Sequence, residues 1–247
     1  MARALRALSL TELRLFVREP AAVGFTLLLP VLLLLLNAGG DDVGRPSAEF
    51  GGEIGLDVLQ AGLVVFVVAT AGVMGLAESL ANERERGVLR RLSLAPIRPA
   101  NVLGAHVIVQ LAVAAAGTVL LCGLAIVVFG AGLPDAPLRA VALIVLAALT
   151  AAALGGAIGA LAPTTRVAQA AASALYFPKL FLSGAAMPRE NLPDAARTIG
   201  DVLPLTYVVE GLRDAWAGAP PAASSVLVPV AALLVGGLIS LRAFRWS

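Results

Sequence analysis

Residues 102–129 read VLGAHVIVQLAVAAAGTVLLCGLAIVVF, a run of 28 residues without Asp, Glu, Lys or Arg. As a helix this run would be about 42 Å long, and therefore longer than the hydrocarbon core of a bilayer, which is about 30 Å thick. We expect a transmembrane helix that either tilts or extends into the cytoplasm. Five further apolar runs accompany it, and together they decide the fold class.

The composition of the whole chain is that of a polytopic membrane protein. Of its 247 residues, 59% are hydrophobic and 14% are charged, whereas soluble domains carry about 25% charged residues. We expect an all-α fold in which residues 1–247 form a single transmembrane domain. Apolar runs of bilayer length predict its six transmembrane helices: Ala21–Asn37, Val58–Ala77, Val102–Phe129, Leu138–Leu161, Val167–Ala186 and Ala222–Leu241.

The distribution of arginine predicts the orientation of these spans. With the N-terminus placed in the cytoplasm, the segments on that side hold twelve arginines and the outer segments hold five. Positive residues are retained on the cytoplasmic side, so we expect both termini there. A cleavable signal peptide is the alternative interpretation of the start of the chain. The long polar lead and the interruption of the apolar run by Pro30 favour a retained first span.

Residues 1–20 are predicted to form an amphipathic helix on the membrane surface. Ser9 and Glu12 have capping-box spacing, and the arginines that follow lie on a different side of the helix from the apolar residues. Glu19 precedes a proline, which ends the helix. The alternative is a plain positively charged flank of the first span, and the short capping pattern does not choose between the two.

Residues 78–99, ESLANERERGVLRRLSLAPIRP, combine many charges with an apolar side. The segment holds eight of the 34 charged residues, yet its leucines and Val88 are spaced so that a helix would keep one apolar face. We expect a short helix across the cytoplasmic mouth of the bundle, ended by Pro96 and Pro99 and able to dock into a groove on a soluble partner. A charged loop that only fixes the topology is the alternative.

Residues 187–216 are predicted to form a helix-turn-helix that dips into the outer leaflet. Three prolines divide the segment into pieces that are too short to cross a membrane. Backbone that breaks at membrane depth must be shielded by protein, so this piece should pack between the fifth and sixth spans. Glu210 and Arg213 lie three residues apart and can pair on one face of a helix. We expect this pair to pin the re-entrant helices rather than to bind substrate.

Motifs for ATP hydrolysis and metal binding are absent from the sequence. Lys179 is the only lysine and lies in an apolar run, so there is no phosphate-binding loop lysine and the chain alone cannot hydrolyse ATP. One cysteine, Cys122, and one histidine, His106, cannot form a Cys/His metal cluster or an internal disulfide. We therefore predict a non-catalytic protein with no catalytic, cofactor-binding or metal residues.

Several single residues have more than one interpretation. Lys179 can snorkel to the outer interface, form a structural ion pair or contact an acidic substrate, and it is the residue we place in a possible substrate path. His106 is expected to be a plain interfacial residue, and Glu78 to meet water or nearby arginines. Gly155 and Gly159 have the G-x-x-x-G spacing that permits close approach of helices, within one subunit or between two.

Two local sequences, at their places among six spans, resemble the permease subunit of a type 2 ABC exporter. ERERGVLRRLSLAPI, at residues 83–97, is similar to the cytoplasmic stretch of that family between spans two and three. FLSGAAMP at 181–188 and LPLTYVVEGLR at 203–213 are similar to its outer re-entrant stretch. The resemblance covers essentially the whole chain, and it is nearest in character to antibiotic-resistance exporters of the daunorubicin type.

The resemblance implies partners that the sequence does not contain. It implies two copies of a separate ATPase subunit that bind ATP and Mg, a second permease copy or close paralogue, and a bacterial inner membrane. The segment 82–96 would be the coupling helix, and residues 1–20 a second contact with the ATPase. Nucleic acid is not expected as a partner. The implied ATPase-interface residues are Glu83, Arg84, Glu85, Arg86, Gly87, Arg90 and Arg91.

The substrate implied by the resemblance is a small amphiphilic drug or antibiotic that is moved out of the cell. A lipid or lipid-linked glycan is an alternative substrate. A regulatory membrane component that transports nothing is the alternative from another functional class.

Overall fold

The structure is a computed structural model, which describes residues 24–38, 43–46, 52–94, 99–182, 198 and 200–244. Within these ranges the regular structure is helical, apart from an isolated β-bridge between Pro46 and Ile54. The prediction of an all-α fold is confirmed. The predicted surface helix at 1–20 lies outside the described residues, as does most of the predicted re-entrant segment before residue 204.

The described helices follow the apolar runs of the sequence. In chain order they are the π-helix η1 (Gly24–Leu28), α3 (Leu29–Asn37), α4 (Gly55–Ala69), the π-helix η3 (Thr70–Gly75), α5 (Leu76–Glu85), α6 (Val88–Leu92), α7 (Pro99–Phe129), α8 (Pro137–Leu161), α9 (Thr165–Leu182), α11 (Pro204–Trp216) and α12 (Ser224–Ala243).

Among the described residues, four helices are long and apolar enough to cross a membrane: Gly55–Glu85, Pro99–Phe129, Pro137–Leu161 and Ser224–Ala243. A shorter apolar helix covers Thr26–Asn37, in the first predicted span. The fifth predicted span corresponds to α9, which has 18 residues and includes Arg166 and Lys179. The chain is thus a multi-pass membrane protein by helix length and composition, and the count of six spans stays a prediction.

The second span differs from its predicted bounds. Apolar character stops near Ala77, but α4, η3 and α5 continue as one helical rod to Glu85. The charged residues from Glu78 onwards therefore belong to the end of this rod, and α6 alone forms a separate short helix. The reason is that backbone hydrogen bonds continue a helix beyond the point where its side chains become polar.

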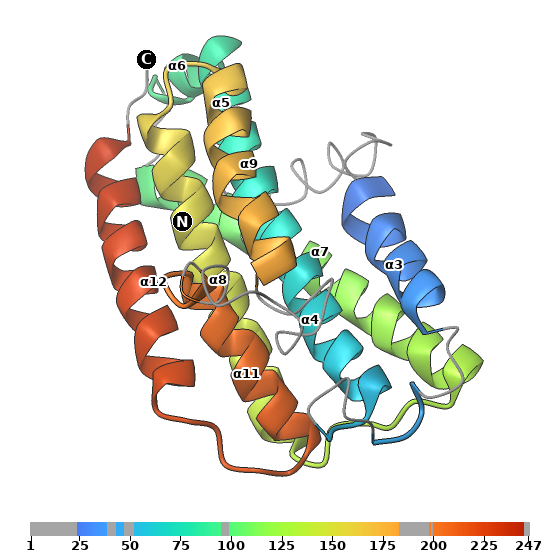
Figure 1. Cartoon of the computed structure of the whole chain (residues 1–247). Coiled ribbons are helices and arrows are strands. Elements are labelled where there is room, and N and C mark those ends of the chain that lie inside the picture. Colours follow the sequence, from blue (N-terminus) through green and yellow to red (C-terminus); the bar gives the residue numbers. More distant parts are fainter. Residues whose placement is uncertain are drawn as a thin grey trace.

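Helix α8 lies at the centre of the bundle, where it packs against α4, η3, α5, α7, α9, α11 and α12 (Figure 1). The rod Gly55–Glu85 is mostly buried inside the bundle, whereas most of the α7 and α12 spans is not. Apolar side chains on those outer faces are stable only against lipid or another protein. The core is therefore built by α8 and the rod.

The G-x-x-x-G pair of α8 serves packing within the chain. A Cβ atom on Gly155 would overlap the carbonyl oxygen of Gly72, and one on Gly159 would lie 3.0 Å from the carbonyl oxygen of Ala77. Both contacts join α8 to the rod. Small residues let two helix backbones approach closely, and here they decide in favour of intrachain packing among the alternatives left open by the sequence.

The π-helix η3 interrupts the rod beside α9. Thr70 Oγ1 donates a hydrogen bond to the carbonyl oxygen of Phe66 at 2.9 Å, and it lies 2.6 Å from the hydroxyl oxygen of Tyr176 on α9. The rings of Phe66 and Tyr176 are 5.4 Å apart between centroids. Single π-helical turns inside α-helices are often found at functional sites, and here the turn is held by a buried contact to a second helix.

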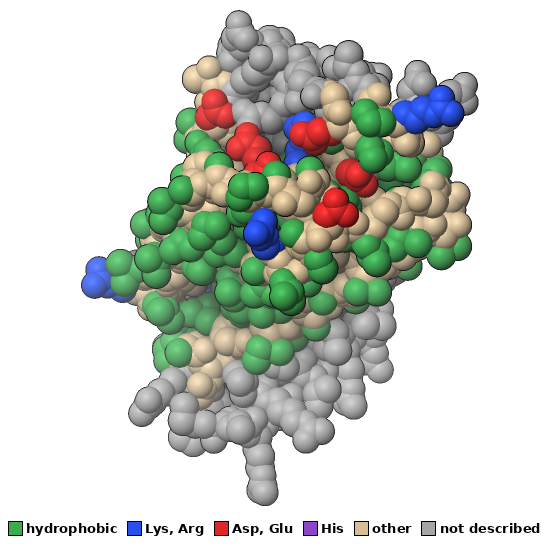
Figure 2. Space-filling model, turned by 90° about the horizontal axis from the view of Figure 1, so that it is seen from below, with side chains coloured by type: hydrophobic (Ala, Val, Ile, Leu, Met, Phe, Trp, Pro, Cys, Tyr) green, Lys and Arg blue, Asp and Glu red, His purple; other side chains and the backbone are tan. Residues whose placement is uncertain are grey.

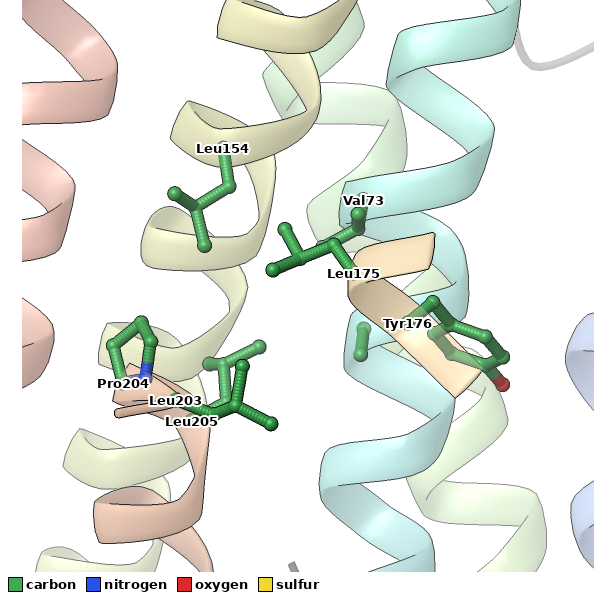
Figure 3. A pocket seen from close by; sticks show the side chains of 8 residues that line it. Val73, Leu154, Leu175, Tyr176, Leu203, Pro204 and Leu205 are labelled. Atoms are coloured by element: carbon green, nitrogen blue, oxygen red, sulfur yellow. The ribbon is translucent and has the colours of Figure 1, made fainter. Parts of the chain in front are cut away.

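A small apolar pocket lies beside this contact, between the rod, α8, α9 and α11 (Figure 3). Side chains from all four elements point into it. The pocket is lined by Ala69, Val73, Leu154, Leu175, Tyr176, Leu203, Pro204 and Leu205.

Candidate functional site

A left-handed turn at Gly87 separates α5 from α6. Gly87 has φ +69°, a conformation that costs little for glycine and much more for residues with a Cβ atom. Its N–H donates to the carbonyl oxygen of Arg84 at 3.0 Å, and the N–H of Arg86 donates to that of Asn82 at 2.9 Å. The end of α5 is thus closed by a glycine cap of the usual kind, and the chain leaves the axis of α5 at a fixed angle.

Helix α6 is anchored by one buried leucine and exposes its two arginines, Arg90 and Arg91. Leu89 is 1% exposed, whereas Leu94, just past the end of α6, is 88% exposed. Figure 1 shows α6 at the end of the bundle where α5 ends and α9 begins. We call the exposed residues on and beside this helix the α6 surface: Arg86, Val88, Arg90, Arg91 and Leu94.

Three consecutive residues at the end of α5 contact three different helices. We call Glu83, Arg84 and Glu85 the α5 clamp. Glu83 contacts α7, because its Oε2 atom lies 3.2 Å from Nε2 of His106. His106 is 3% exposed, so the expectation of a plain interfacial histidine is wrong. Its partner comes from another helix, 23 residues earlier in the sequence.

Arg84 contacts the C-terminal end of α8. Its Nη1 donates to the carbonyl oxygen of Ala160 at 3.1 Å, and its Nη2 donates to those of Gly159 at 2.7 Å and Ala162 at 2.5 Å. The last carbonyl groups of a helix have no partner within the helix and carry partial negative charge. The guanidinium group of Arg84 donates hydrogen bonds to these carbonyl groups, and its positive charge is favourable beside their partial negative charge.

Glu85 contacts the N-terminal end of α9. Its carboxylate accepts the backbone N–H of Thr165 at 3.0 Å and the hydroxyl of the same residue at 2.6 Å. Thr164 completes the cap, since its hydroxyl oxygen accepts the N–H of Val167 at 3.2 Å. A carboxylate at a helix N-terminus is favourable because the free N–H groups carry partial positive charge.

A second contact joins α5 to α9 further into the bundle, about two turns along α5 from Glu85 and one turn along α9 from Thr165. The side-chain amide of Gln169 donates to Glu78 at 2.7 Å. Glu78 therefore has a polar partner from α9, which the expectation of water or arginine did not include. Together with Glu85, this bond aligns the two helices along their polar edges.

The predicted interface residues thus divide into two groups. Arg86, Arg90 and Arg91 lie on the α6 surface and are exposed. Glu83, Arg84 and Glu85 are engaged by helices of their own chain, and Gly87 forms the turn between the groups. Sequence reasoning missed this division because the partners of the clamp lie 23 to 80 residues away.

Acidic side chains gather at the opposite end of the bundle, together with several basic ones (Figure 2). Arg213 on α11 donates through Nε to Glu53 Oε2 at 3.0 Å, which ties α11 to the segment before α4. Burial raises the pKa of Asp214, and the nearby charge of Glu53 raises it further. The predicted pairing of Arg213 with Glu210 stays a prediction. Lys179 belongs to α9, but its side chain lies outside the described residues.

The ABC-2 type transporter family matches residues 3–216 of the chain. No curated protein matches it. The family match includes all the described helices except α12, and the apolar helices are those of a multi-pass membrane protein. The chain therefore belongs to the ABC-2 type transporter family, as the membrane component of an ABC transporter.

Proposed function

We propose that the chain is the permease subunit of an ATP-driven exporter, and that a separate ATPase subunit engages it through the α6 surface. The observation that carries this proposal is the exposure of three arginines, two on a short helix and one just before it, where the helix is positioned by Leu89 and Gly87. Membership of the ABC-2 type transporter family supports the same role.

The α6 surface has the chemistry of a docking site. Arginine binds carboxylates through two parallel N–H groups, and it is enriched at the energetically important positions of interfaces. The exposed Leu94 supplies an apolar contact beside these charges. We therefore expect a groove on the ATPase that presents carboxylates to Arg86, Arg90 and Arg91 and an apolar patch to Leu94.

The proposed complex contains two permease copies, or one copy and a close paralogue, and two ATPase subunits that bind ATP and Mg. Each permease has six spans in a bacterial inner membrane, with the α6 end and both termini in the cytoplasm. The permease itself is non-catalytic. Closure of the ATPase pair would displace α6 in each copy and rock the two bundles, so that the path between them opens alternately to the two sides.

The proposed substrate is a small amphiphilic drug or antibiotic, as in exporters of the daunorubicin type. Aromatic residues make up 5% of the chain, which leaves few rings on which sugars can stack. This favours an amphiphile over a lipid-linked glycan. Stimulation of ATP hydrolysis by daunorubicin, but not by phospholipid or glycolipid, in the reconstituted complex would support this substrate class.

Charge reversal on the α6 surface tests the proposed role. The chain is co-expressed with a candidate ABC ATPase subunit from the same organism, and the complex is purified through a tag on the chain. We expect Arg90→Glu combined with Arg91→Glu to abolish recovery of the ATPase, while Arg45→Glu, at an exposed arginine of the opposite end, leaves it unchanged. Full recovery of the ATPase with the Arg90 and Arg91 variant would overturn the proposal.

A further inference from the structure

We propose that the α5 clamp transmits motion: Glu83, Arg84 and Glu85 carry a displacement of α6 to α7, α8 and α9, and are not themselves contacts of the ATPase. The proposal rests on the proposed function, since it assumes that the ATPase moves α6. It assigns to these three residues a role different from the interface role that the family resemblance implies.

The geometry of an α-helix explains how one segment reaches three neighbours. Consecutive residues are about 100° apart around the axis, so three of them spread over about 200°. Glu83 meets His106 on α7, Arg84 meets the last carbonyl groups of α8, and Glu85 meets the first residue of α9. The end of α5 is therefore tied to three helices at the same level of the bundle.

Arg84 has the least freedom to serve an outside partner. Its Nη1 and Nη2 atoms make three hydrogen bonds to the last turn of α8 and to the residue that follows it, and its side chain is partly buried. An ATPase contact would have to break these bonds and leave carbonyl groups without a donor. Loss of a hydrogen bond at a buried group is unfavourable, so Arg84 is better placed to hold α8 than to bind another protein.

The signs of the clamp charges match the helix ends that they contact. Arg84 lies at the negative end of α8, and Glu85 lies at the positive end of α9. These two ends are joined by the short turn Ala162–Thr164. Arg84 and Glu85 thus bind the two sides of this turn. A movement of α5 would therefore also move the end of α8 and the start of α9.

The clamp and the turn at Gly87 together define what would move. Gly87 joins α6 directly to the clamped end of α5, so a push on α6 reaches the clamp through two residues of backbone. Without the clamp, the end of α5 would bend alone. With it, the push is shared by the α8–α9 turn, and α9 moves with α6 as one body.

The experiment measures whether α6 and α9 move together. Spin labels are placed at Ser93→Cys, which lies beside α6 but is not part of the α6 surface, and at Ala170→Cys, both exposed, in a Cys122→Ala background, in the full complex with its ATPase. We expect the same separation between the labels without nucleotide and with trapped Mg-ATP. In Thr165→Val and in Glu85→Gln, we expect Mg-ATP to change this separation, with ATPase recovery unaltered.

Matched variants separate the clamp from general damage to α9. Thr164→Val removes the hydroxyl that caps α9 within its own helix, and it should behave like the wild type. Thr165→Ser keeps the hydroxyl that Glu85 accepts, and it should also behave like the wild type. Because Glu85 and Thr165 act through the same contact, the double variant should be no worse than the stronger single variant.

Two results would overturn the clamp, and they differ from failure of the proposed function. One is that Mg-ATP has the same effect on the label separation in the wild type and in Thr165→Val, whether that effect is a change or none. The other is loss of ATPase recovery in Glu85→Gln with no effect of Thr165→Val, which would make Glu85 a partner contact. If the wild-type chain recovers no ATPase, the proposed function fails, and transmission by the clamp fails with it.

Discussion

Arg84 and Gly159 are joined by a hydrogen bond of 2.7 Å from the guanidinium Nη2 to the backbone carbonyl oxygen. The same glycine lets the rod approach α8 closely, since a Cβ atom on it would lie 3.0 Å from the carbonyl oxygen of Ala77 and 3.0 Å from Cβ of Leu80. Close packing and the polar contact therefore depend on each other. The arginine reaches the carbonyl groups of α8 because glycine keeps the two helices near.

Gly155→Ala should destabilise the bundle. The added Cβ atom would meet the backbone of Gly72 and Val73, not a flexible side chain, so α8 must shift away from the rod. We expect a loss of about 1–3 kcal/mol, as for other overpacked sites, measured by thermal unfolding in detergent. Gly123→Ala on α7 is the control, because nothing lies within 4 Å of its added Cβ atom. Equal unfolding temperatures for the two variants would contradict the packing described.

Gly87→Ala should destabilise the position of α6 through the backbone conformation, not through a clash of the added Cβ atom. Nothing lies within 4 Å of a Cβ atom at this position, but its φ is +69°. The penalty is therefore confined to the backbone and amounts to about 1–2 kcal/mol. Hydrogen exchange of the α6 amides should be faster in Gly87→Ala than in the wild type. Gly87→Asn should lie closer to the wild type, because asparagine tolerates the left-handed conformation, and the reverse order of the two variants would argue against this turn.

His106→Leu should destabilise the chain, because it removes the partner of the partly buried Glu83. We expect a loss of about 1–3 kcal/mol, which is typical when a polar group loses its partner. The double variant His106→Leu with Glu83→Leu should recover most of this loss, since both polar groups are then gone. Thermal unfolding of the two single variants and the double variant forms the measurement, and strict additivity of the losses would rule out their direct contact.

Asp214→Asn should stabilise the folded chain at neutral pH. Burial raises the pKa of Asp214 above its ordinary value of 3.8, so the folded state binds this proton more tightly than the unfolded state. The ionised carboxylate therefore destabilises the fold once the pH exceeds the raised value, and this penalty disappears below about pH 3.8. The gain from Asp214→Asn should vanish over the same range. Unfolding temperatures from pH 3 to 8, with Asp201→Asn as an exposed control at the same end, measure it.

The spans were the part of the fold that the sequence could predict. Predicted and observed bounds agree within three residues for α7, α8 and α12. A helix that crosses a bilayer needs an unbroken apolar run, and such a run can be read directly from the sequence. The end of the second span was predicted eight residues too early. Charge marks where side chains leave the apolar phase, but the helix continues to Glu85 and is closed by the left-handed conformation of Gly87.

The candidate site was predictable in its residues and not in its contacts. The charges from Glu83 to Arg91 stand out in any reading of the sequence, and the glycine between them indicates a turn. Which of them are engaged within the chain depends on contacts with His106, Gly159 and Thr165. Those contacts form only when three helices pack around α5, so a local sequence pattern does not predict them.

The π-helical turn η3 also sets the direction in which the clamp points. Such a turn holds about one residue more than an α-helical turn, so every side chain after Gly75 is rotated by about 100° from its place in an uninterrupted helix. If the same sequence were wound as an uninterrupted α-helix, Glu83 would face the carbonyl end of α8 and Arg84 the amide end of α9, each with the wrong sign. The π-helical turn near the middle of the rod, some ten residues away, thus determines which charged residue of the clamp meets which helix end.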